Sequence, residues 1–325
     1  MKFRGKKFTL KRIIRGIARR IDNTQKRIED IIFKNLFVIS QSLGFHIIKN
    51  HYYGPIPDTR TLKDELWQHH SELIGIDMNE ESQLRLLSNF VSMLKCEHQS
   101  LQHYGEMTIK PYEYYVDYGS FGLGTVDGEI LYCMIRYYKP KKIFEIGSGN
   151  STRLLAQAVL RNKEDNGHEC ELIAIEPYPT DFLKAGFPGL SKLICTKVQD
   201  IPLSEFSKLK DNDILFIDSS HVLKIGSDVQ FEYLEILPRL NKGVIVHAHD
   251  IFLPAEYRKE WVLKDYRFWT EQYLLQAFLL FNDSFQVLYA GSYMHLKHPD
   301  KLEMAFNSYK RDERWPGSFW MRKIK

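Results

Sequence analysis

Short runs of β-branched and aromatic residues alternate with helical patterns from residue 111 to the C-terminus. Seven runs have the length and composition of strands, at 141–147, 170–176, 192–199, 213–219, 243–250, 285–291 and 317–324. Helical patterns precede or separate these runs, near 127–138, 151–162, 203–210, 224–238, 254–264 and 268–281. Because strands that alternate with helices form βαβ units, the pattern predicts a doubly wound α/β domain with a mostly parallel, seven-stranded sheet.

The first 110 residues have helical periodicity and little strand signal. Large aliphatic residues recur there at intervals of three and four, which is the spacing of an amphipathic helix. They are Ile13, Ile14, Ile17, Ile21, Ile28, Ile31, Ile32 and Leu36. Further helical patterns lie near 60–72 and 82–100. We therefore expect a helical accessory region over 1–110, followed by the α/β domain over 111–325.

Positive charge is concentrated at one end of the chain. Nine of the 45 Lys and Arg residues, and no Asp or Glu, lie within residues 1–20, which leaves 36 basic against 41 acidic residues elsewhere. The basic helix within 1–36 could lie on an anionic membrane surface, bind a partner, or pack its apolar face on the rest of the protein. The acidic balance of the remainder argues against nucleic-acid binding. No apolar run reaches the ~18–20 residues that span a bilayer, so we expect a cytoplasmic protein whose basic helix is the part able to contact the inner membrane surface.

The first predicted strand of the domain leads into a glycine turn, EIGSGNST at 145–152. Gly147 and Gly149 allow a sharp turn and the close approach of a ligand. A dinucleotide-binding turn has a third glycine where this chain has Thr152. That difference, together with the carboxylate of Glu145 inside the strand, argues against a bound pyrophosphate and favours a ligand with a positive charge.

Acidic residues also follow the next three predicted strands. Glu176 ends the second strand, where an acid can accept hydrogen bonds from a ribose diol. Asp200 follows the third strand, where a side-chain acceptor can reach the amino group of an adenine, and Asp218 ends the fourth. Any one of them could be a helix cap or a solvated loop acid. Because ligands of an open α/β sheet bind at the carboxyl ends of the strands, acids at four consecutive strands favour a ligand site.

These motifs resemble those of the class I S-adenosylmethionine-dependent methyltransferases, and the flanks at 121–140 and 268–279 are similar to a bacterial subgroup called methyltransferase family 24. The likeness covers roughly residues 111–325 and is carried by EIGSGNST, IAIEPY (173–178), VQDIPLSEF (198–206) and DILFIDSSH (213–221). It implies S-adenosylmethionine as the cofactor. The residues that the resemblance assigns to it are Glu145, Gly147 and Gly149 for the methionine part, Glu176 for the ribose hydroxyls and Asp200 for the adenine, with Ser148, Ser151 and Asp218 beside them.

A second group of polar residues follows the fourth and fifth predicted strands. Residues two apart in a strand point to the same side, so His247 and His249 share a side, and Asp250 comes at the strand end. Because these two strands are neighbours in this fold, we expect Asp218 and His221 to lie close to His249 and Asp250. Carboxylates and imidazoles together can bind a divalent metal or act as a general base.

Three roles for this group stay open. His221 and His249 are the leading candidates for a general base, since an imidazole exchanges protons near neutral pH. Asp218, His249 and Asp250 are the candidate ligands of a divalent metal, magnesium or another ion. The resemblance to methyltransferases of macrolide sugars implies an acidic pair where this chain has His249 and Asp250, which weakens the case for magnesium. The third role is a structural polar network.

The expected reaction is an in-line displacement in which a hydroxyl oxygen of a small molecule or a sugar attacks the sulfonium methyl group, with base or metal assistance. One alternative is a different reaction on the same fold, such as that of a hydroxylase or a lyase. Another is a non-catalytic protein that binds a membrane or a partner and keeps a relic nucleotide pocket. Binding of S-adenosylhomocysteine and of NAD separates these classes.

Overall fold

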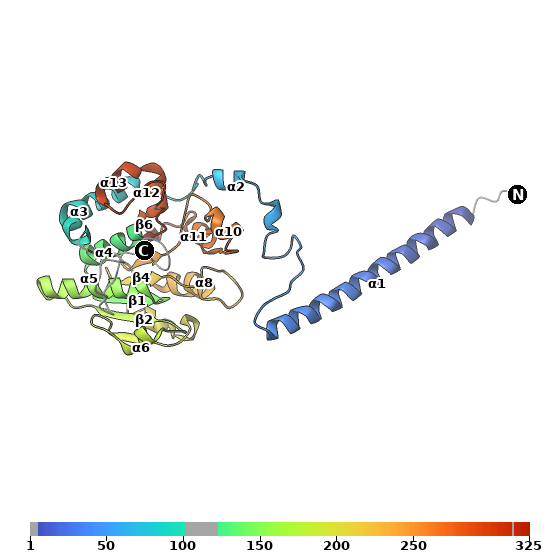
Figure 1. Ribbon diagram of the computed structural model, residues 1–325, viewed down its shortest axis with the longest axis horizontal. Coiled ribbons are helices and arrows are strands. Elements are labelled where there is room, and N and C mark those ends of the chain that lie inside the picture. Colours follow the sequence, from blue (N-terminus) through green and yellow to red (C-terminus); the bar gives the residue numbers. More distant parts are fainter. Residues whose placement is uncertain (1–5, 100, 102–122, 314) are drawn as a thin grey trace. The chain divides into compact units, whose positions relative to one another are not determined.

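The computed structural model describes residues 6–99, 101, 123–313 and 315–325 (Figure 1). The chain forms two compact units, of which the first ends at Lys63 and the second begins at Asp64. The predicted boundary between residues 110 and 111 lies outside the described residues, so it stays a prediction.

The first unit contains a long helix followed by an irregular segment. Helix α1 spans Lys6–Ser42, which confirms the predicted amphipathic helix and extends it at both ends. A short 3₁₀ helix, η1, spans Thr59–Thr61. Within this unit the side chains of Ile28, Ile32 and Ile39, which share one face of α1, are 53%, 50% and 58% exposed. Among the described residues, no helix is long and apolar enough to cross a bilayer.

The second unit is built on one seven-stranded sheet, as the sequence predicts. Its strands are β1 (Lys142–Ile146), β2 (Glu171–Ile175), β3 (Lys192–Ile194), β4 (Ile214–Ile217), β5 (Ile245–Ala248), β6 (Phe285–Ala290) and β7 (Phe319–Lys323). The spatial order is β3-β2-β1-β4-β5-β7-β6. Strands β1 to β5 pair in parallel, and β7 is antiparallel to both β5 and β6. Chain order reverses between β1 and β4, which is where open α/β sheets bind their ligands.

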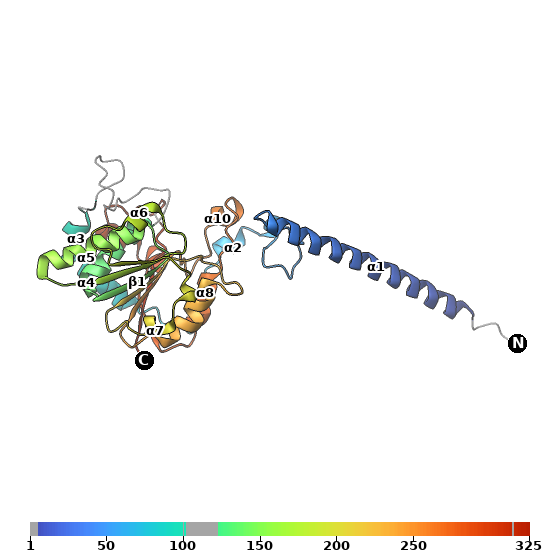
Figure 2. The same cartoon turned by 90° about the horizontal axis from the view of Figure 1, so that it is seen from below.

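Helices cover both faces of the sheet, so the domain is doubly wound (Figure 2). The helices of the second unit are α2 (Glu65–Gln68), α3 (Glu80–Gln99), α4 (Thr125–Tyr138), α5 (Asn150–Asn166), α6 (Asp181–Ala185), η2 (Val198–Asp200), α7 (Leu203–Phe206), α8 (Asp228–Phe231), η3 (Glu232–Ile236), α9 (Leu237–Arg239), α10 (Lys259–Leu263), α11 (Glu271–Leu279), α12 (Gly291–Lys297) and α13 (Pro299–Ala305). Side chains alternate along each strand, so Ile143 and Phe144 of β1 belong to different cores. The core around Ile143 contains α3, α4, α5 and α13, and the core around Phe144 contains α7, α8, η3 and α11.

Some helices differ from the prediction. The helix expected near 60–72 does not form as one element, since only η1 and the four-residue α2 lie there. Helices α12 and α13 follow β6 without a glycine-rich loop, and no helix was predicted between residues 291 and 317. Proline at the first position of α13 suits a helix start, because its missing N–H group has no partner there in any case.

Four parallel strands end in register at one edge of the sheet. Their last residues, which are paired neighbours, are Ile146, Ile175, Ile217 and Ala248. The residues that follow them are Gly147, Glu176, Asp218 and His249. The ladder continues for one more residue, since the N–H groups of Gly147, Asp218 and His249 donate to the last residue of a neighbouring strand. This edge therefore gathers the candidate site residues.

Candidate functional site

The glycine turn after β1 is shaped by the end of β4. Gly147 has φ of +80°, and a Cβ atom there would lie 1.9 Å from the carbonyl oxygen of Asp218. Only glycine fits this position, because a side chain would collide with backbone that the sheet holds in place. A Cβ atom at Gly149 would meet nothing within 4 Å. Of the two glycines, Gly149 therefore leaves the open space, and Gly147 allows the close approach of two strand ends.

Glu145 is a buried carboxylate beside this turn. It lies on the face of β1 that packs on α5, and its Oε1 atom accepts a hydrogen bond of 2.6 Å from Ser151 Oγ in the first turn of that helix. Within the described part of the chain, its Oε2 atom and Ser148 Oγ are buried without a hydrogen-bond partner. Burial raises the pKa of Glu145 to about 8, although the hydrogen bond from Ser151 opposes the shift. A positive charge next to Oε2 would favour the ionised form.

Glu176 connects the ends of β1 and β2 and borders a cavity. Its carboxylate accepts hydrogen bonds from the N–H groups of Ser148 (3.2 Å) and Tyr178 (2.8 Å). A cavity of about 430 Å³ lies at this edge of the sheet, and Gly147, Glu176 and Asp218 are among its lining residues. Three of the residues expected at the cofactor therefore share one cavity.

Asp200 lies differently from the other expected cofactor residues. Its side chain is exposed at the end of η2 and accepts a long hydrogen bond of 3.4 Å from Thr196 Oγ1. Val198 and Gln199, from the same short helix, line the cavity, whereas Asp200 does not. Its contact with adenine stays a prediction.

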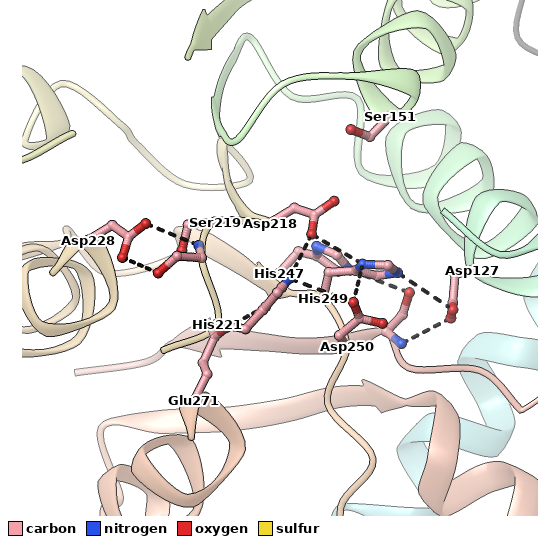
Figure 3. Close-up of polar contacts among 12 residues, drawn as sticks. Asp127, Ser151, Asp218, Ser219, His221, Asp228, His247, His249, Asp250 and Glu271 are labelled. Carbon is pink, nitrogen blue, oxygen red and sulfur yellow. Dashed lines mark hydrogen bonds and ion pairs between the residues drawn. The ribbon is translucent and has the colours of Figure 1, made fainter. Parts of the chain in front are cut away.

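The polar group expected at the ends of β4 and β5 is brought together in the structure (Figure 3). Asp218 Oδ1 lies 3.3 Å from His249 Nδ1 and 3.3 Å from His221 Nε2. Asp250 Oδ2 lies 3.7 Å and 3.6 Å from the same two nitrogen atoms. Both histidine side chains are under 10% exposed, and the two aspartates are about one-fifth exposed. We call these four residues the Asp–His cluster.

Two further carboxylates flank the Asp–His cluster, and neither is predicted from the sequence. Glu271, the first residue of α11, has Oε2 2.8 Å from His221 Nδ1. Asp127, in the first turn of α4, has Oδ2 3.8 Å from His249 Nε2. The backbone N–H groups of Gly317 and Ser318 fix Asp127. Each histidine thus has a carboxylate within 4 Å of both of its ring nitrogens, and among the described residues His249 Nε2 makes no hydrogen bond.

These carboxylates control the charge of the histidines. Burial lowers the pKa of His221, but its hydrogen bonds with Asp218 and Glu271 outweigh burial and raise the pKa to about 10. The pKa of His249 is also held well above its ordinary value, because the charges of Asp250 and Asp218 outweigh burial. Burial opposes ionisation of Asp218, yet the neighbouring histidines hold the pKa of that carboxyl well below its ordinary value. At neutral pH both imidazoles are therefore protonated unless another cation neutralises the carboxylates.

The cluster also has the form of a metal-binding group. Among the described residues, Asp218, His221 and Asp250 offer ligand atoms that all lie within 4.8 Å of one another. The sequence predicts His249 as the third ligand, whereas the geometry brings His221 to that position. Two carboxylates and an imidazole suit several divalent ions. Asp250 and His221 both have positive φ, +55° and +58°, a conformation that is uncommon for such residues and recurs at functional sites.

His247 has a structural environment. Its ring lies between Phe216 and Trp320, with ring centroids 4.1 Å and 4.5 Å away, and it is fully buried. Its ring centroid is 5.9 Å from that of His249, which confirms that the two share a side of β5. Burial lowers its pKa well below the ordinary value, and the charge of His249 adds to this effect. His247 is therefore neutral and packs behind the cluster.

Aromatic side chains lie next to His221. The ring centroid of Trp269 is 4.4 Å from that of His221, and Trp261 follows at 5.2 Å from Trp269. The guanidinium carbon of Arg267 lies 5.1 Å from the ring centroid of Trp261 and 5.3 Å from that of Trp269.

Comparisons with known proteins find a relative in sequence and similar chains among solved structures. An uncharacterized protein of Archaeoglobus fulgidus is 30% identical over 199 residues, which cover 58% of this chain and 85% of that protein. Among solved structures, an O-methyltransferase from Bacillus cereus in complex with SAH covers 74% of this chain and 91% of its own, at 13% identity and a TM-score of 0.36. The apo structure of CmcI-N160 covers 62% of this chain and 71% of its own, at 15% identity and a TM-score of 0.33.

A family model described as a methyltransferase domain matches residues 144–251. This range contains the glycine turn, Glu176 and the whole Asp–His cluster, which are the parts that the sheet gathers at one edge. The chain therefore belongs to the class I S-adenosylmethionine-dependent methyltransferases.

Proposed function

We propose that this methyltransferase transfers the methyl group of S-adenosylmethionine to a hydroxyl oxygen of a small-molecule or sugar acceptor. The proposal is supported by the place of Asp218 between two sites. Asp218 lines the cavity beside the glycine turn, and it also belongs to the Asp–His cluster. A group that removes the proton of a hydroxyl must act where the methyl group arrives. The shared aspartate brings these two requirements to one place.

The residues of the turn fit the donor. S-adenosylmethionine supplies a methyl group on a sulfonium and carries an ammonium group on its methionine part. Glu145 Oε2, a buried oxygen without a partner among the described residues, offers an acceptor for that ammonium group. The open space at Gly149 would let the methionine part approach the turn, and Glu176 would accept from the ribose hydroxyls.

The raised pKa of Glu145 gives donor binding a pH dependence. Below about pH 8 the carboxyl is mostly protonated, and an ammonium group can pair with it only after the proton leaves. Affinity for S-adenosylhomocysteine should therefore rise with pH below this point, by up to about tenfold per unit. Calorimetric titrations over this range measure the slope. Glu145→Gln should bind weakly and without the slope, and a pH-independent affinity in the wild type would remove Glu145 from the donor site.

The Asp–His cluster would handle the proton of the acceptor. A hydroxyl becomes a good nucleophile when its proton is removed as the new bond forms, and such help contributes roughly 10²–10⁴-fold. A protonated imidazole cannot take that proton. Asp218, His221 and Asp250 would hold a divalent ion. In the absence of an ion, the two protonated imidazoles balance the charge of the carboxylates, and a bound ion would take over that role. His249, which is not one of these three ligands, could then be neutral and accept the proton.

The side chains beside His221 suit an acceptor with a flat ring or a sugar. Trp269 and Trp261 offer apolar ring faces, which sugars and aromatic rings both favour. Arg267, which lies over these indoles, could bind a carboxylate or a phosphate on the acceptor.

Methyl transfer can be measured directly. The purified protein is incubated with S-adenosylmethionine labelled in its methyl group and with panels of sugar nucleotides, glycans and small hydroxylated metabolites. We expect labelled product with at least one panel, loss of product with a chelator and recovery with a divalent ion. Product that persists under chelation would contradict the metal-binding role of the Asp–His cluster. Donor binding without transfer to any panel would favour a different reaction on the same fold.

We also propose that α1 lies on an anionic membrane surface. Its start is strongly basic, with nine Lys or Arg and no acid in residues 1–20, and such residues each contribute about 1 kcal/mol near an anionic surface. Further along the helix, Ile28, Ile32 and Ile39 share a face and are exposed within the first unit. Positive charge together with an apolar face is typical of helices that bind at the bilayer interface.

Truncation of the basic segment separates this membrane role from the donor site. Deletion of residues 1–20 should abolish flotation with vesicles of phosphatidylcholine and phosphatidylglycerol. It should leave the melting temperature and S-adenosylhomocysteine affinity unchanged, because the residues proposed for the cofactor all lie in β1 or after it. Vesicles of phosphatidylcholine alone serve as the control. Equal flotation with both vesicle types would contradict the electrostatic account, and a lower melting temperature would indicate that the segment packs on the core.

A further inference from the structure

We propose that Glu271 is the positioning residue of His221: its carboxylate accepts the Nδ1–H group, so that Nε2 is the nitrogen presented to Asp218 and Asp250. This inference rests on the proposed role of the Asp–His cluster and adds a residue outside the segment that the methyltransferase domain model matches. Glu271 contacts neither the cavity nor the two aspartates directly. It would act only through the imidazole.

The imidazole of His221 lies between Glu271 on one side and the two aspartates of the cluster on the other (Figure 3). Glu271 Oε2 lies 2.8 Å from His221 Nδ1, which is the shortest contact that the ring makes with a carboxylate. The other ring nitrogen, Nε2, lies 3.3 Å from Asp218 and 3.6 Å from Asp250. The side chains of Glu271 and His221 are 1% and 8% exposed, whereas the aspartates are partly open to solvent. The ring therefore separates a closed side, held by Glu271, from an open side that faces the cluster.

The start of α11 also fixes the backbone of His221. The carbonyl oxygen of His221 accepts hydrogen bonds from the N–H groups of Thr270 (2.9 Å) and Glu271 (3.2 Å). Thr270 Oγ1 accepts from the N–H group of Leu223 at 2.7 Å. The ring of Trp269 packs against the imidazole, with a centroid distance of 4.4 Å and an angle of 45° between the ring planes. The segment 269–271 thus holds both the main chain and the ring of His221, and little freedom remains for the ring to turn.

Glu271 is itself held in place. Its Oε1 atom accepts a hydrogen bond of 2.9 Å from the hydroxyl of Tyr233, and the residue is fully buried. It begins a nine-residue helix, whose N-terminus is a favourable place for a negative charge. A buried carboxylate with one oxygen on a tyrosine and the other on an imidazole has a fixed direction. This is the arrangement expected of a group that orients a histidine.

The chemical consequence is the choice of nitrogen. A neutral imidazole has one N–H group, and a carboxylate that accepts at Nδ1 keeps the hydrogen on that atom. The lone pair is then on Nε2, on the side of Asp218 and Asp250. A base needs this lone pair to receive a proton, and a metal ligand needs it to bind an ion, so the inference holds for both roles of the cluster.

The chain offers a matched control in Glu232. This residue is also fully buried, and its carboxyl accepts a hydrogen bond of 3.0 Å from Ser219. Burial raises its pKa well above the ordinary value, with a further contribution from the charge of Glu271, which favours the uncharged form. Glu232→Gln therefore tests the loss of a buried carboxyl whose hydrogen bond goes to Ser219 and not to a histidine. A purely structural role of buried acids in this region would make Glu232→Gln and Glu271→Gln behave alike.

The first test is spectroscopic and needs no acceptor. Protein with ¹⁵N-labelled histidine rings is observed by long-range ¹H–¹⁵N correlation, and the signals of His221, one of 12 histidines, are identified by their loss in His221→Gln. We expect a proton on Nδ1 with the strong downfield shift of a hydrogen bond to a carboxylate. The shift should decrease in the isosteric Glu271→Gln and stay unchanged in Glu232→Gln. An unshifted Nδ1 proton in the wild type would overturn the inference.

The second test is kinetic and uses an acceptor found by methyl-transfer screening. Glu271→Gln should lower kcat by roughly 10–100-fold, with KM for the acceptor and affinity for S-adenosylhomocysteine nearly unchanged, and Glu232→Gln should retain the wild-type kcat. Wild-type kcat in Glu271→Gln, or equal losses in both variants, would overturn the inference. If no acceptor is methylated, the proposed function fails, and the spectroscopic result still decides whether Glu271 orients His221.

Discussion

Replacement of His221 by alanine should lower the turnover of methyl transfer by roughly 10²–10⁴-fold and leave the affinity for S-adenosylhomocysteine nearly unchanged. The imidazole lies between Glu271 and the two aspartates of the cluster and is not among the residues that line the donor cavity. Its loss removes either a base or a metal ligand, and both act on the acceptor in the transition state. Single-turnover kinetics with labelled donor, together with calorimetry, measure the two quantities.

His249→Ala should behave in the same way, because its Nδ1 atom contacts the same oxygen of Asp218 as His221 does. Glu176→Ala is the contrasting variant. It should weaken donor binding by about 1–3 kcal/mol, because it removes a charged acceptor and the carboxylate that holds the N–H group of Ser148. Equal losses of affinity and turnover in all three variants would indicate that the cluster only stabilises the fold of this edge.

Gly147→Val should destabilise the domain by about 4 kcal/mol or more, which is a large part of the ~5–15 kcal/mol that stabilises a typical domain. The reason is a collision with the carbonyl oxygen of Asp218, 1.9 Å from the position of the new Cβ, combined with a positive φ that a β-branched residue avoids. We expect the variant either to be insoluble or to unfold at a much lower urea concentration than the wild type. From the sequence alone, this glycine is explained by the approach of a ligand, whereas the structure explains it by the approach of β4.

Gly149→Ala is the matched control for that substitution. Its Cβ would enter open space, so the variant should unfold like the wild type. Because the same space is where the donor would approach the turn, the alanine should weaken binding of S-adenosylhomocysteine. A Gly147→Val protein with wild-type stability would contradict the close packing of β1 and β4. Wild-type affinity in Gly149→Ala would mean that the ligand does not use this space.

The sheet could be predicted from the sequence because its signal is local. Buried parallel strands appear as short β-branched runs, and each of the seven runs forms a strand. The positions of Asp218 and His249 also follow from local information, since each comes directly after a strand and β4 and β5 are neighbours. The short helices were harder to predict. Helix α2 has four residues, too few for a helical period to be visible, and α12 follows β6 without a break.

The residues that complete the site could not be predicted, because they depend on contacts distant in sequence. Glu271 lies 50 residues from His221, and no spacing connects them. Asp127 reaches His249 from α4, which precedes β1 in the sequence. The charge of the histidines could not be predicted from the sequence either. An isolated imidazole has a pKa near ~6.5, and the pKa of His221 rises to about 10 only because carboxylates surround it in the fold.

Calorimetric titration with S-adenosylhomocysteine tests the central claim, that a donor binds at the carboxyl ends of β1 and β2, most directly, because it requires neither an acceptor nor a metal. NAD is titrated in parallel as a ligand with a pyrophosphate. We predict one site of micromolar affinity for S-adenosylhomocysteine, weakened in Glu176→Ala, and no binding of NAD. Binding of NAD, or of neither ligand, would contradict the assignment of this edge to S-adenosylmethionine.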